Sequence, residues 1–192
     1  RDFQVTLGRN HAKYFDANGW FYFTKEVFDL LYPSYGDTYP IYNGSIGMTY
    51  EQGGSGRAGL GVITAIGDTL TLKDRIAHHF TTGLSTVEVS SQNAAKLNEE
   101  FRKYHQNKDF KYKSYVLKGS KDKLDALKSL LEKHNIEYGD LSSGSYRGHS
   151  YSSGNIGSLS IDKNGMVVST DQPKGTLVKV LFEPSTKLTD SL

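Results

Sequence analysis

The chain has 192 residues, enough for one ordinary domain or two small ones. Its 23 basic and 21 acidic side chains leave a net charge of +2, which favours neither a nucleic-acid footprint nor a polybasic membrane contact. No apolar run approaches the roughly 20 residues needed to cross a bilayer. Cysteine is absent, which excludes disulfides and thiol catalysis. We therefore expect no nucleic-acid partner and no membrane span.

The first fifty residues predict a helix, a loop and a strand. Residues 1–19 are mixed and polar and end on the turn signal "DANG", so no regular element is predicted there. The stretch "WFYFTKEVFDLLYP" (20–33) has large apolar residues at helical spacing, and Pro33 ends the helix that they predict. A loop rich in Gly, Pro and Asp follows. In "SIGMTYEQ" (45–52) apolar residues alternate with small or polar ones, which predicts a strand with Glu51 at its C-terminal end.

The strongest helical pattern lies in residues 72–101, where apolar side chains recur every three to four positions. Asp68 or Thr71 can cap its start, because a short side-chain oxygen accepts from the free N–H groups of the first turn. Such a one-sided helix is expected to lie against a sheet. The character of the sequence changes at "HQNKD" (105–109), which predicts a domain boundary after residue 105.

The remainder, residues 106–192, predicts a small α+β domain with a ferredoxin-like or similar arrangement. A stripe of leucines predicts a helix, and a Ser/Gly-rich stretch predicts a long loop. The predicted elements are strands at 111–117, 136–138, 158–162, 166–169 and 177–182, the helix at 121–134 and the loop at 142–158. No motif attaches chemistry to this part, so we expect an accessory domain.

Two patterns that could carry chemistry are incomplete. "GSGRAG" spells G-x-G-x-x-G, but "LGVITAIGD" separates it from any helix whose N-terminus could meet a pyrophosphate, so we interpret it as a loop. His78 and His79 are adjacent on a predicted helix and point about 100° apart. A zinc site needs three converging protein ligands, and no histidine spacing here supplies them. The histidines are interpreted as surface or packing residues.

Glu51 allows two interpretations. A lone acid at a strand end beside a Gly-rich loop is usually a structural hydrogen-bond partner, but α/β proteins also keep their chemistry at the carboxyl edge of the sheet. From spacing alone both interpretations stay open.

The stretch "YPSYGDTYPIYNGSIGMTYEQ", followed by "DTLTLKDRIAHHFTTGLSTVE", resembles the C-terminal part of the catalytic domain of carboxypeptidase A-like zinc metallocarboxypeptidases, in particular their secreted bacterial branch. The resemblance covers roughly residues 10–105. It implies that residues 1–105 are the C-terminal half of a mixed-sheet α/β catalytic domain, followed by the small α+β domain at 106–192. It also implies a secreted or periplasmic bacterial protein.

The resemblance assigns roles to individual residues. Glu51 matches the family's general base, which takes a proton from a zinc-bound water and passes it to the leaving amine. Tyr32, or alternatively Tyr35, matches the mobile tyrosine that closes over the peptide substrate. Arg57 is a further candidate for recognising an acidic group.

The family's zinc ligands and its substrate-carboxylate arginine precede this region and are not in the sequence. We therefore expect a fragment of a zinc-dependent peptidase that is inactive alone and has the remainder of its parent chain as a partner. The alternative function is a non-catalytic module, in which the aromatic loop 32–42 and the Ser/Gly loop 142–158 bind a glycan or a peptide.

Overall fold

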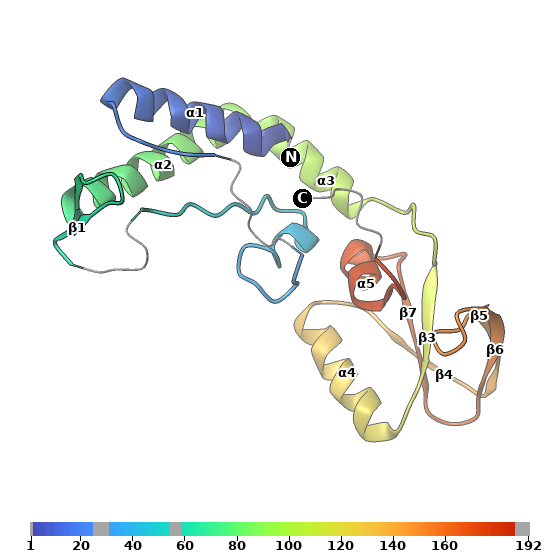
Figure 1. The fold of residues 1–192 in the computed structure, drawn as a ribbon. Helices are drawn as coiled ribbons and strands as arrows, with labels where there is room; N and C mark the ends of the chain where they lie inside the picture. The colour runs from blue at the N-terminus through green and yellow to red at the C-terminus, as the bar shows by residue number, and fades with distance from the viewer. Residues whose placement is uncertain (1, 25–30, 54–58, 187–192) are drawn as a thin grey trace. The chain divides into compact units, whose positions relative to one another are not determined.

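The computed structural model describes residues 2–24, 31–53 and 59–186 (Figure 1). The fold is mixed α/β with small antiparallel sheets. Within those three ranges no helix combines the length and the apolar character needed to traverse a bilayer.

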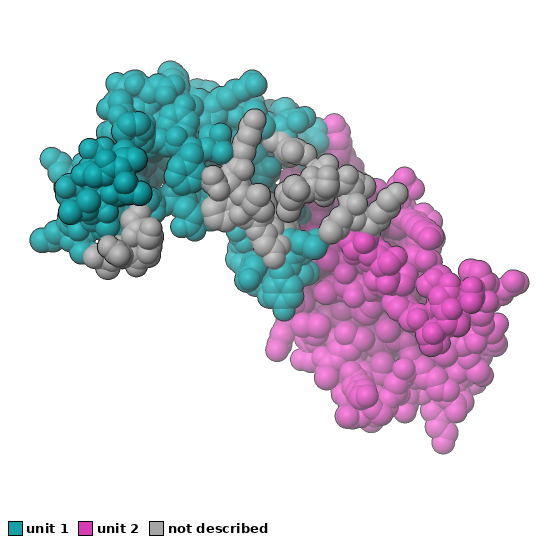
Figure 2. Space-filling model, viewed as in Figure 1, with its two compact units in different colours: residues 1–41, 45–100 teal, residues 42–44, 101–192 magenta. Residues whose placement is uncertain are grey.

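The chain divides into two compact units, shown in different colours in Figure 2. Unit 1 comprises residues 1–41 and 45–100, and unit 2 comprises residues 42–44 and 101–192. The interpretation of the two parts as a catalytic domain and an accessory domain stays a prediction.

Helix α1 (Asp2–Asn18) occupies the stretch for which the sequence predicted no regular element, so that interpretation was wrong. The turn signal was read correctly, because Gly19 follows the helix with a φ of 65°, the left-handed conformation that ends many helices. Only Leu7 and Phe15 of α1 are buried, and the helix packs along α2 (Leu72–Gln92). The polar composition concealed α1 because its stability comes from this packing and not from a broad apolar face.

The helix predicted at 20–33 is not found in its described parts. Residues 20–24 and 31–33 are irregular, and residues 25–30 lie outside the described residues. The ring of Trp20 instead packs against Phe15 of α1 at 5.3 Å between centroids. The start of this stretch therefore packs on α1 through an aromatic contact instead of forming the helix that its apolar spacing predicted.

The strand predicted at 45–52 is irregular as well. A strand needs a neighbour to receive its backbone hydrogen bonds, and no strand pairs with this segment in the described part of the chain. Side chains hold it instead: the Gln4 amide donates to the Gly47 carbonyl oxygen at 2.7 Å, and the Thr49 hydroxyl donates to Asp37 at 2.6 Å. The Thr49 hydrogen bond holds the pKa of Asp37 below its ordinary value. A Cβ at position 47 would clash with the Asp37 carbonyl oxygen, so only glycine allows this approach.

The long helix predicted at 72–101 is divided into α2 and α3 (Ala94–His105). The break falls at Asn93, whose side-chain amide donates to the Val89 carbonyl oxygen at 2.8 Å. Asparagine interrupts helices in this way because its side chain competes for backbone groups.

Helix α2 begins directly after a short hairpin of β1 (Gly61–Ile63) and β2 (Thr69–Thr71). Of the two predicted caps, Thr71 is the one used. Its hydroxyl accepts from the Asp74 N–H at 3.2 Å, and the Asp74 carboxylate accepts from the Thr71 N–H at 2.9 Å. The two bonds form a capping box, which fixes where α2 starts.

One face of α2 is apolar and exposed. The helix was expected to lie against a sheet, but in the described part of the chain it packs against α1 instead, through the opposite face. Five large side chains on the uncovered face are between 42% and 65% exposed. This apolar strip consists of Leu72, Ile76, Phe80, Leu84 and Val87.

Unit 2 contains a three-stranded antiparallel sheet with β7 at its centre and a separate hairpin. Met166 and Val168 are two positions apart on β7, so their side chains lie on one face of the sheet, and both are fully buried. Leu131 of α4 and Val178 of α5 are fully buried too. The elements are β3 (Ser114–Lys118), α4 (Lys121–Lys133), β4 (Gly139–Leu141), β5 (Gly144–His149), β6 (Ile156–Ile161), β7 (Gly165–Ser169) and α5 (Gly175–Phe182).

Local patterns predicted β3, α4, β6 and β7 of unit 2 but not the rest. The predicted strand at 177–182 is helix α5, because a short apolar run does not distinguish a strand from a buried helix. The predicted strand at 136–138 lies three residues later, as β4. Much of the predicted loop 142–158 forms the β5–β6 hairpin.

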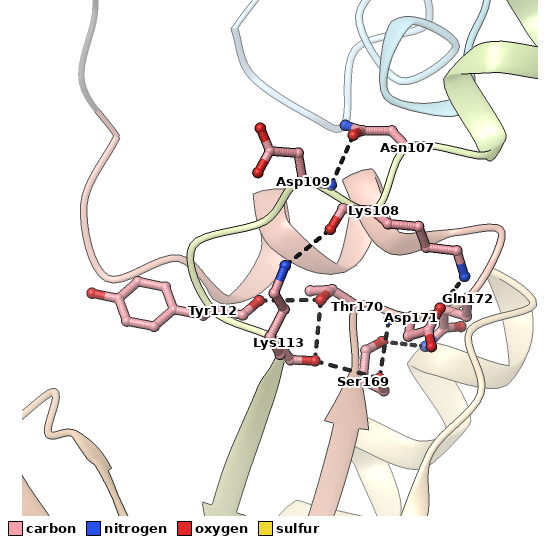
Figure 3. Close-up of polar contacts among 9 residues, drawn as sticks. All are labelled: Asn107, Lys108, Asp109, Tyr112, Lys113, Ser169, Thr170, Asp171 and Gln172. Carbon is pink, nitrogen blue, oxygen red and sulfur yellow. Dashed lines mark hydrogen bonds and ion pairs between the residues drawn. The ribbon is translucent and has the colours of Figure 1, made fainter.

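Polar side chains fix the connection that leads into β3 (Figure 3). The buried Thr170 hydroxyl contacts the carbonyl oxygens of Tyr112 and Lys113, each at 3.1 Å. The Lys113 ammonium donates to the Lys108 carbonyl oxygen at 3.0 Å, while the Tyr112 ring points away from the cluster (Figure 3). These groups satisfy one another, so the cluster serves the fold.

The apolar strip generates the first prediction. Exposed contiguous apolar side chains bind environment-sensitive dyes. Replacing Phe80 and Leu84 together by Ser should lower the fluorescence of bound anilinonaphthalene sulfonate without loss of helical circular dichroism. His79→Ser, an exposed change on α2 outside the strip, is the control and should leave the dye signal unchanged. An equal signal from all three proteins would contradict an uncovered strip.

Candidate functional site

Unit 1 contains a cavity of about 330 Å³ between α1, α2 and the irregular residues 21–24 and 49–53. This volume is at the lower end of the range for small-molecule sites. Aromatic side chains supply much of the wall, and Glu51, Gln52 and two histidines also line it. The aromatic lining residues are Phe15, Phe21, Tyr22, Phe23 and Tyr50.

Tyr50 is held by side chains from both helices. Its hydroxyl lies 2.9 Å from His11 Nε2 on α1 and 3.0 Å from Thr86 Oγ1 on α2. The His11 ring also meets the Tyr50 ring edge to face, at 5.0 Å between centroids. On its other side, His11 Nδ1 lies 2.8 Å from the hydroxyl of Ser85, which is only 1% exposed. The residue before Glu51 is therefore tied to the packing between α1 and α2.

The direction of these hydrogen bonds follows by elimination. The Asn10 amide donates to Ser85 Oγ at 2.8 Å, and the Thr86 hydroxyl donates to the Thr82 carbonyl oxygen at 2.8 Å. The Ser85 proton is then free to go to His11 Nδ1, and Thr86 Oγ1 is free to accept from Tyr50. The contacts with Ser85, Tyr50 and Thr86 are all made when His11 is neutral with its proton on Nε2, donating to Tyr50. The single Tyr50 proton then goes to Thr86 Oγ1 at 3.0 Å, which is closer than Met48 Sδ at 3.8 Å. The arrangement thus selects one tautomer of His11.

Gln52 is held in a similar way on the other side of Glu51. Its side-chain oxygen lies 3.2 Å from His78 Nδ1, and His78 is 9% exposed. The His78 ring packs against the rings of Trp20 and Phe15, at 4.6 and 5.4 Å between centroids. A buried histidine of α2 is therefore fixed by aromatic packing and contacts the residue after Glu51.

Glu51 itself is exposed and lines the cavity. No hydrogen bond or ion pair to another described residue engages its carboxylate, although both of its neighbours in sequence are engaged. A carboxylate without a partner remains available to a ligand or to water.

Burial shapes the electrostatics of the cavity. It lowers the pKa of both His11 and His78 below the ordinary value of 6.5, and nearby Asp74 opposes the effect at His78 only in part. Both imidazoles are therefore neutral at pH 7. Glu51 is then the single formally charged side chain among the described residues that line the cavity.

A second polar group links the same two helices. The Glu88 carboxylate of α2 accepts from the Asn10 amide at 2.7 Å and from the Tyr14 hydroxyl at 2.9 Å, both on α1. These bonds hold the pKa of Glu88 low and raise the pKa of Tyr14. Because Asn10 also contacts Ser85, this group is continuous with the one that holds His11.

The other predicted site residues do not join Glu51 at the cavity. Tyr32 and Tyr35 are described but do not line it; their rings lie edge to face at 5.5 Å between centroids, and the side chains are 57% and 51% exposed. Arg57 lies outside the described residues. Glu51 also does not end a strand, because the segment that carries it is irregular.

Sequence reasoning missed His11, Tyr50, Gln52 and His78 as parts of a site. His11 was set aside as a zinc ligand because it lies too near Glu51 in the sequence, and the stretch around it was not predicted to be a helix. Once residues 2–18 are helical, His11 falls four positions from each of Leu7 and Phe15, the two buried residues of α1. That one-sided row is the signal that could have identified it.

The described residues do not fit a metal site of their own. The resemblance implies zinc, and a zinc site needs at least three converging side-chain ligands. No group of three or more His, Cys, Asp or Glu side chains that could hold a metal occurs in residues 2–24, 31–53 and 59–186. Any zinc that works with Glu51 would have to be held by residues other than these.

Comparisons with known proteins return no relative: no family model, no curated protein and no solved structure matches the chain. The function is therefore argued from the cavity and from Glu51.

The lowered pKa values generate a pH prediction. In the unfolded chain His11 and His78 bind protons around pH 6.5, whereas the folded chain takes them up only at lower pH. The unfolded state then binds more protons, so stability falls as the pH drops from about 7.5 to about 5. Thermal unfolding across this range should show the loss.

His11→Gln, which removes one of the two imidazoles with a lowered pKa, should make the loss smaller. His149→Ala, which changes a histidine of β5 in unit 2, should leave the loss as it is. A stability that is constant or rises toward pH 5 would contradict the lowered pKa values of His11 and His78.

Proposed function

We propose that the chain supplies the general base of a hydrolase that resembles zinc metallocarboxypeptidases, and that Glu51 is this base. The observation that carries the proposal is the position of Glu51: its carboxylate is exposed at a cavity, without a partner among the described residues, while both sequence neighbours are held by side-chain contacts. A structural carboxylate would be expected to have its acceptors filled, as those of Glu88 are.

The chemistry assigned to this chain is proton transfer. Glu51 accepts a proton from a water molecule as that water attacks the scissile carbonyl carbon. The carbon–nitrogen bond then breaks, and protonated Glu51 gives the same proton to the leaving amine, which returns the carboxylate to its starting state. A cavity whose histidines are neutral leaves Glu51 as the group that carries the charge.

The proposal includes further polypeptide beyond the described residues. The apolar strip on α2 supports this, because a helix face of five large apolar side chains is normally buried against a sheet or another helix. We propose that the remainder of a parent chain covers the strip, completes a carboxypeptidase-like mixed sheet and holds the zinc. A secreted or periplasmic bacterial protein acting on a peptide, with unit 2 as a ferredoxin-like accessory domain, belongs to the same proposal.

Glu51→Gln in the complete enzyme tests the proposal. The amide keeps the shape of the side chain but cannot accept the proton, so kcat for a C-terminal peptide substrate should fall by about 10²–10⁴-fold. The zinc content, measured by atomic emission, should not change. Glu137→Gln, the same change on an exposed side chain of unit 2, should have no effect.

Two outcomes would contradict the proposal. Full activity in Glu51→Gln would remove the general base. Robust hydrolysis by the present chain alone, incubated with zinc and a chromogenic C-terminal peptide, would show that no further polypeptide is required.

The second candidate function is binding of a glycan or a peptide without catalysis. The exposure of Tyr32 and Tyr35 favours it, because paired exposed tyrosines present apolar faces with polar tips to a ligand. The Ser/Gly stretch 142–158 adds another exposed aromatic residue, Tyr151. This function does not require Glu51.

Tyr35→Ala separates the two candidates. If the chain is a binding module, it should retain a ligand from a glycan array or a peptide library, and Tyr35→Ala should weaken that affinity by about threefold to tenfold. Glu51→Gln should leave the affinity unchanged. Absence of any ligand in both screens would contradict the binding module.

A further inference from the structure

We propose that Tyr50 and Gln52 are positioning residues for Glu51, anchored to α1 and α2 through His11 and His78. The inference rests on the proposed function and goes beyond it, because the resemblance assigns no role to any of these four residues. The supporting pattern is that the residues on both sides of Glu51 each contact a different imidazole, half-buried His11 on one side and buried His78 on the other, while Glu51 itself has no partner among the described residues.

The segment that carries Glu51 needs such anchors because it has no regular structure. Residues 45–52 pair with no strand in the described part of the chain. A side chain on irregular backbone explores many positions unless its neighbours are fixed. Only about 1 Å of misplacement of a reacting group is enough to cost a large factor in rate. Two anchors that flank Glu51 restrict the backbone on both sides of it.

The anchor at Tyr50 is itself well supported. His11 is fixed by the buried Ser85 hydroxyl at Nδ1, which leaves Nε2 directed at the Tyr50 hydroxyl at 2.9 Å. Thr86 contacts the same hydroxyl from α2 at 3.0 Å. The phenol therefore reaches both helices, and it keeps its place only while they stay packed.

The anchor at Gln52 depends on aromatic packing. His78 is held between the rings of Phe15 and Trp20, so its ring has little freedom to turn. Its Nδ1 proton donates to the Gln52 side-chain oxygen at 3.2 Å. Neutral His78 can make this contact without bringing a second formal charge next to Glu51.

Tyr50→Phe and Gln52→Met test the inference, because each removes the polar contact and nearly keeps the shape and volume. In the complete enzyme each should lower kcat per zinc-loaded site by about tenfold, with KM and zinc content unchanged. The double variant should lose less than the product of the two single losses if both anchors fix one backbone position. Tyr138→Phe is the matched control, since it removes one tyrosine hydroxyl hydrogen bond, to Glu132 at 2.6 Å, in unit 2.

A second measurement on the present chain does not depend on activity. Backbone ¹⁵N order parameters across residues 49–53 should fall in the double variant, while those in α4 should not change. Unchanged order parameters in this segment would overturn the inference whatever the enzyme does.

Glu51→Gln, measured alongside, distinguishes the two proposals. If it abolishes hydrolysis while Tyr50→Phe and Gln52→Met keep kcat within twofold, the positioning inference is wrong and the general base stands. If Glu51→Gln keeps full activity, the proposed function fails and the positioning role fails with it.

Discussion

The contact between α1 and α2 is the constraint on which the rest of unit 1 depends. Apolar packing contributes to it through Leu7 and Phe15, but its specific part is polar. The buried Ser85 hydroxyl of α2 meets two side chains of α1, Asn10 and His11. A buried hydroxyl is costly unless it is satisfied, so these bonds fix how the two helices register along each other. The cavity beside Glu51 has its shape because that register is fixed.

The residues next to Glu51 connect the helix packing to the proposed chemistry. Tyr50 contacts His11 of α1 and Gln52 contacts His78 of α2, and these contacts restrict an irregular segment that has no strand partner in the described part of the chain. The neutrality of the two histidines is part of the same arrangement, because burial disfavours their charged forms. Glu51 thus lines an aromatic cavity, and no other described residue engages its carboxylate. Under the proposed function, the exposed apolar strip on α2 is the surface that the remainder of the catalytic domain would cover.

The sequence predicted the elements whose signal is local. Helix α4, strand β7 and the Thr71 cap of α2 follow from spacing and from side chains within a few residues. Helix α1 was missed because it is stabilised by contacts with residues more than seventy positions away, and α5 was misread because a short apolar run fits two structures. The role of Glu51 as a general base stays a prediction; the structure places this residue on an irregular segment at a cavity, a setting that was not foreseen. His11 reaches Tyr50 across 39 residues and Ser85 across 74, and no pattern within one segment contains that information.

The state of the His11 ring tests the central claim most directly, namely that a hydrogen-bond chain from the helix packing holds the residue next to Glu51. Long-range proton–nitrogen correlation spectra of the ¹⁵N-labelled chain at pH 7 report which ring nitrogen carries the proton. The contacts with Ser85 and Tyr50 predict a neutral ring with the proton on Nε2, and a shift of the Nε2 signal in Tyr50→Phe. A proton on Nδ1, a doubly protonated ring, or spectra that ignore the loss of the Tyr50 hydroxyl would contradict the claim.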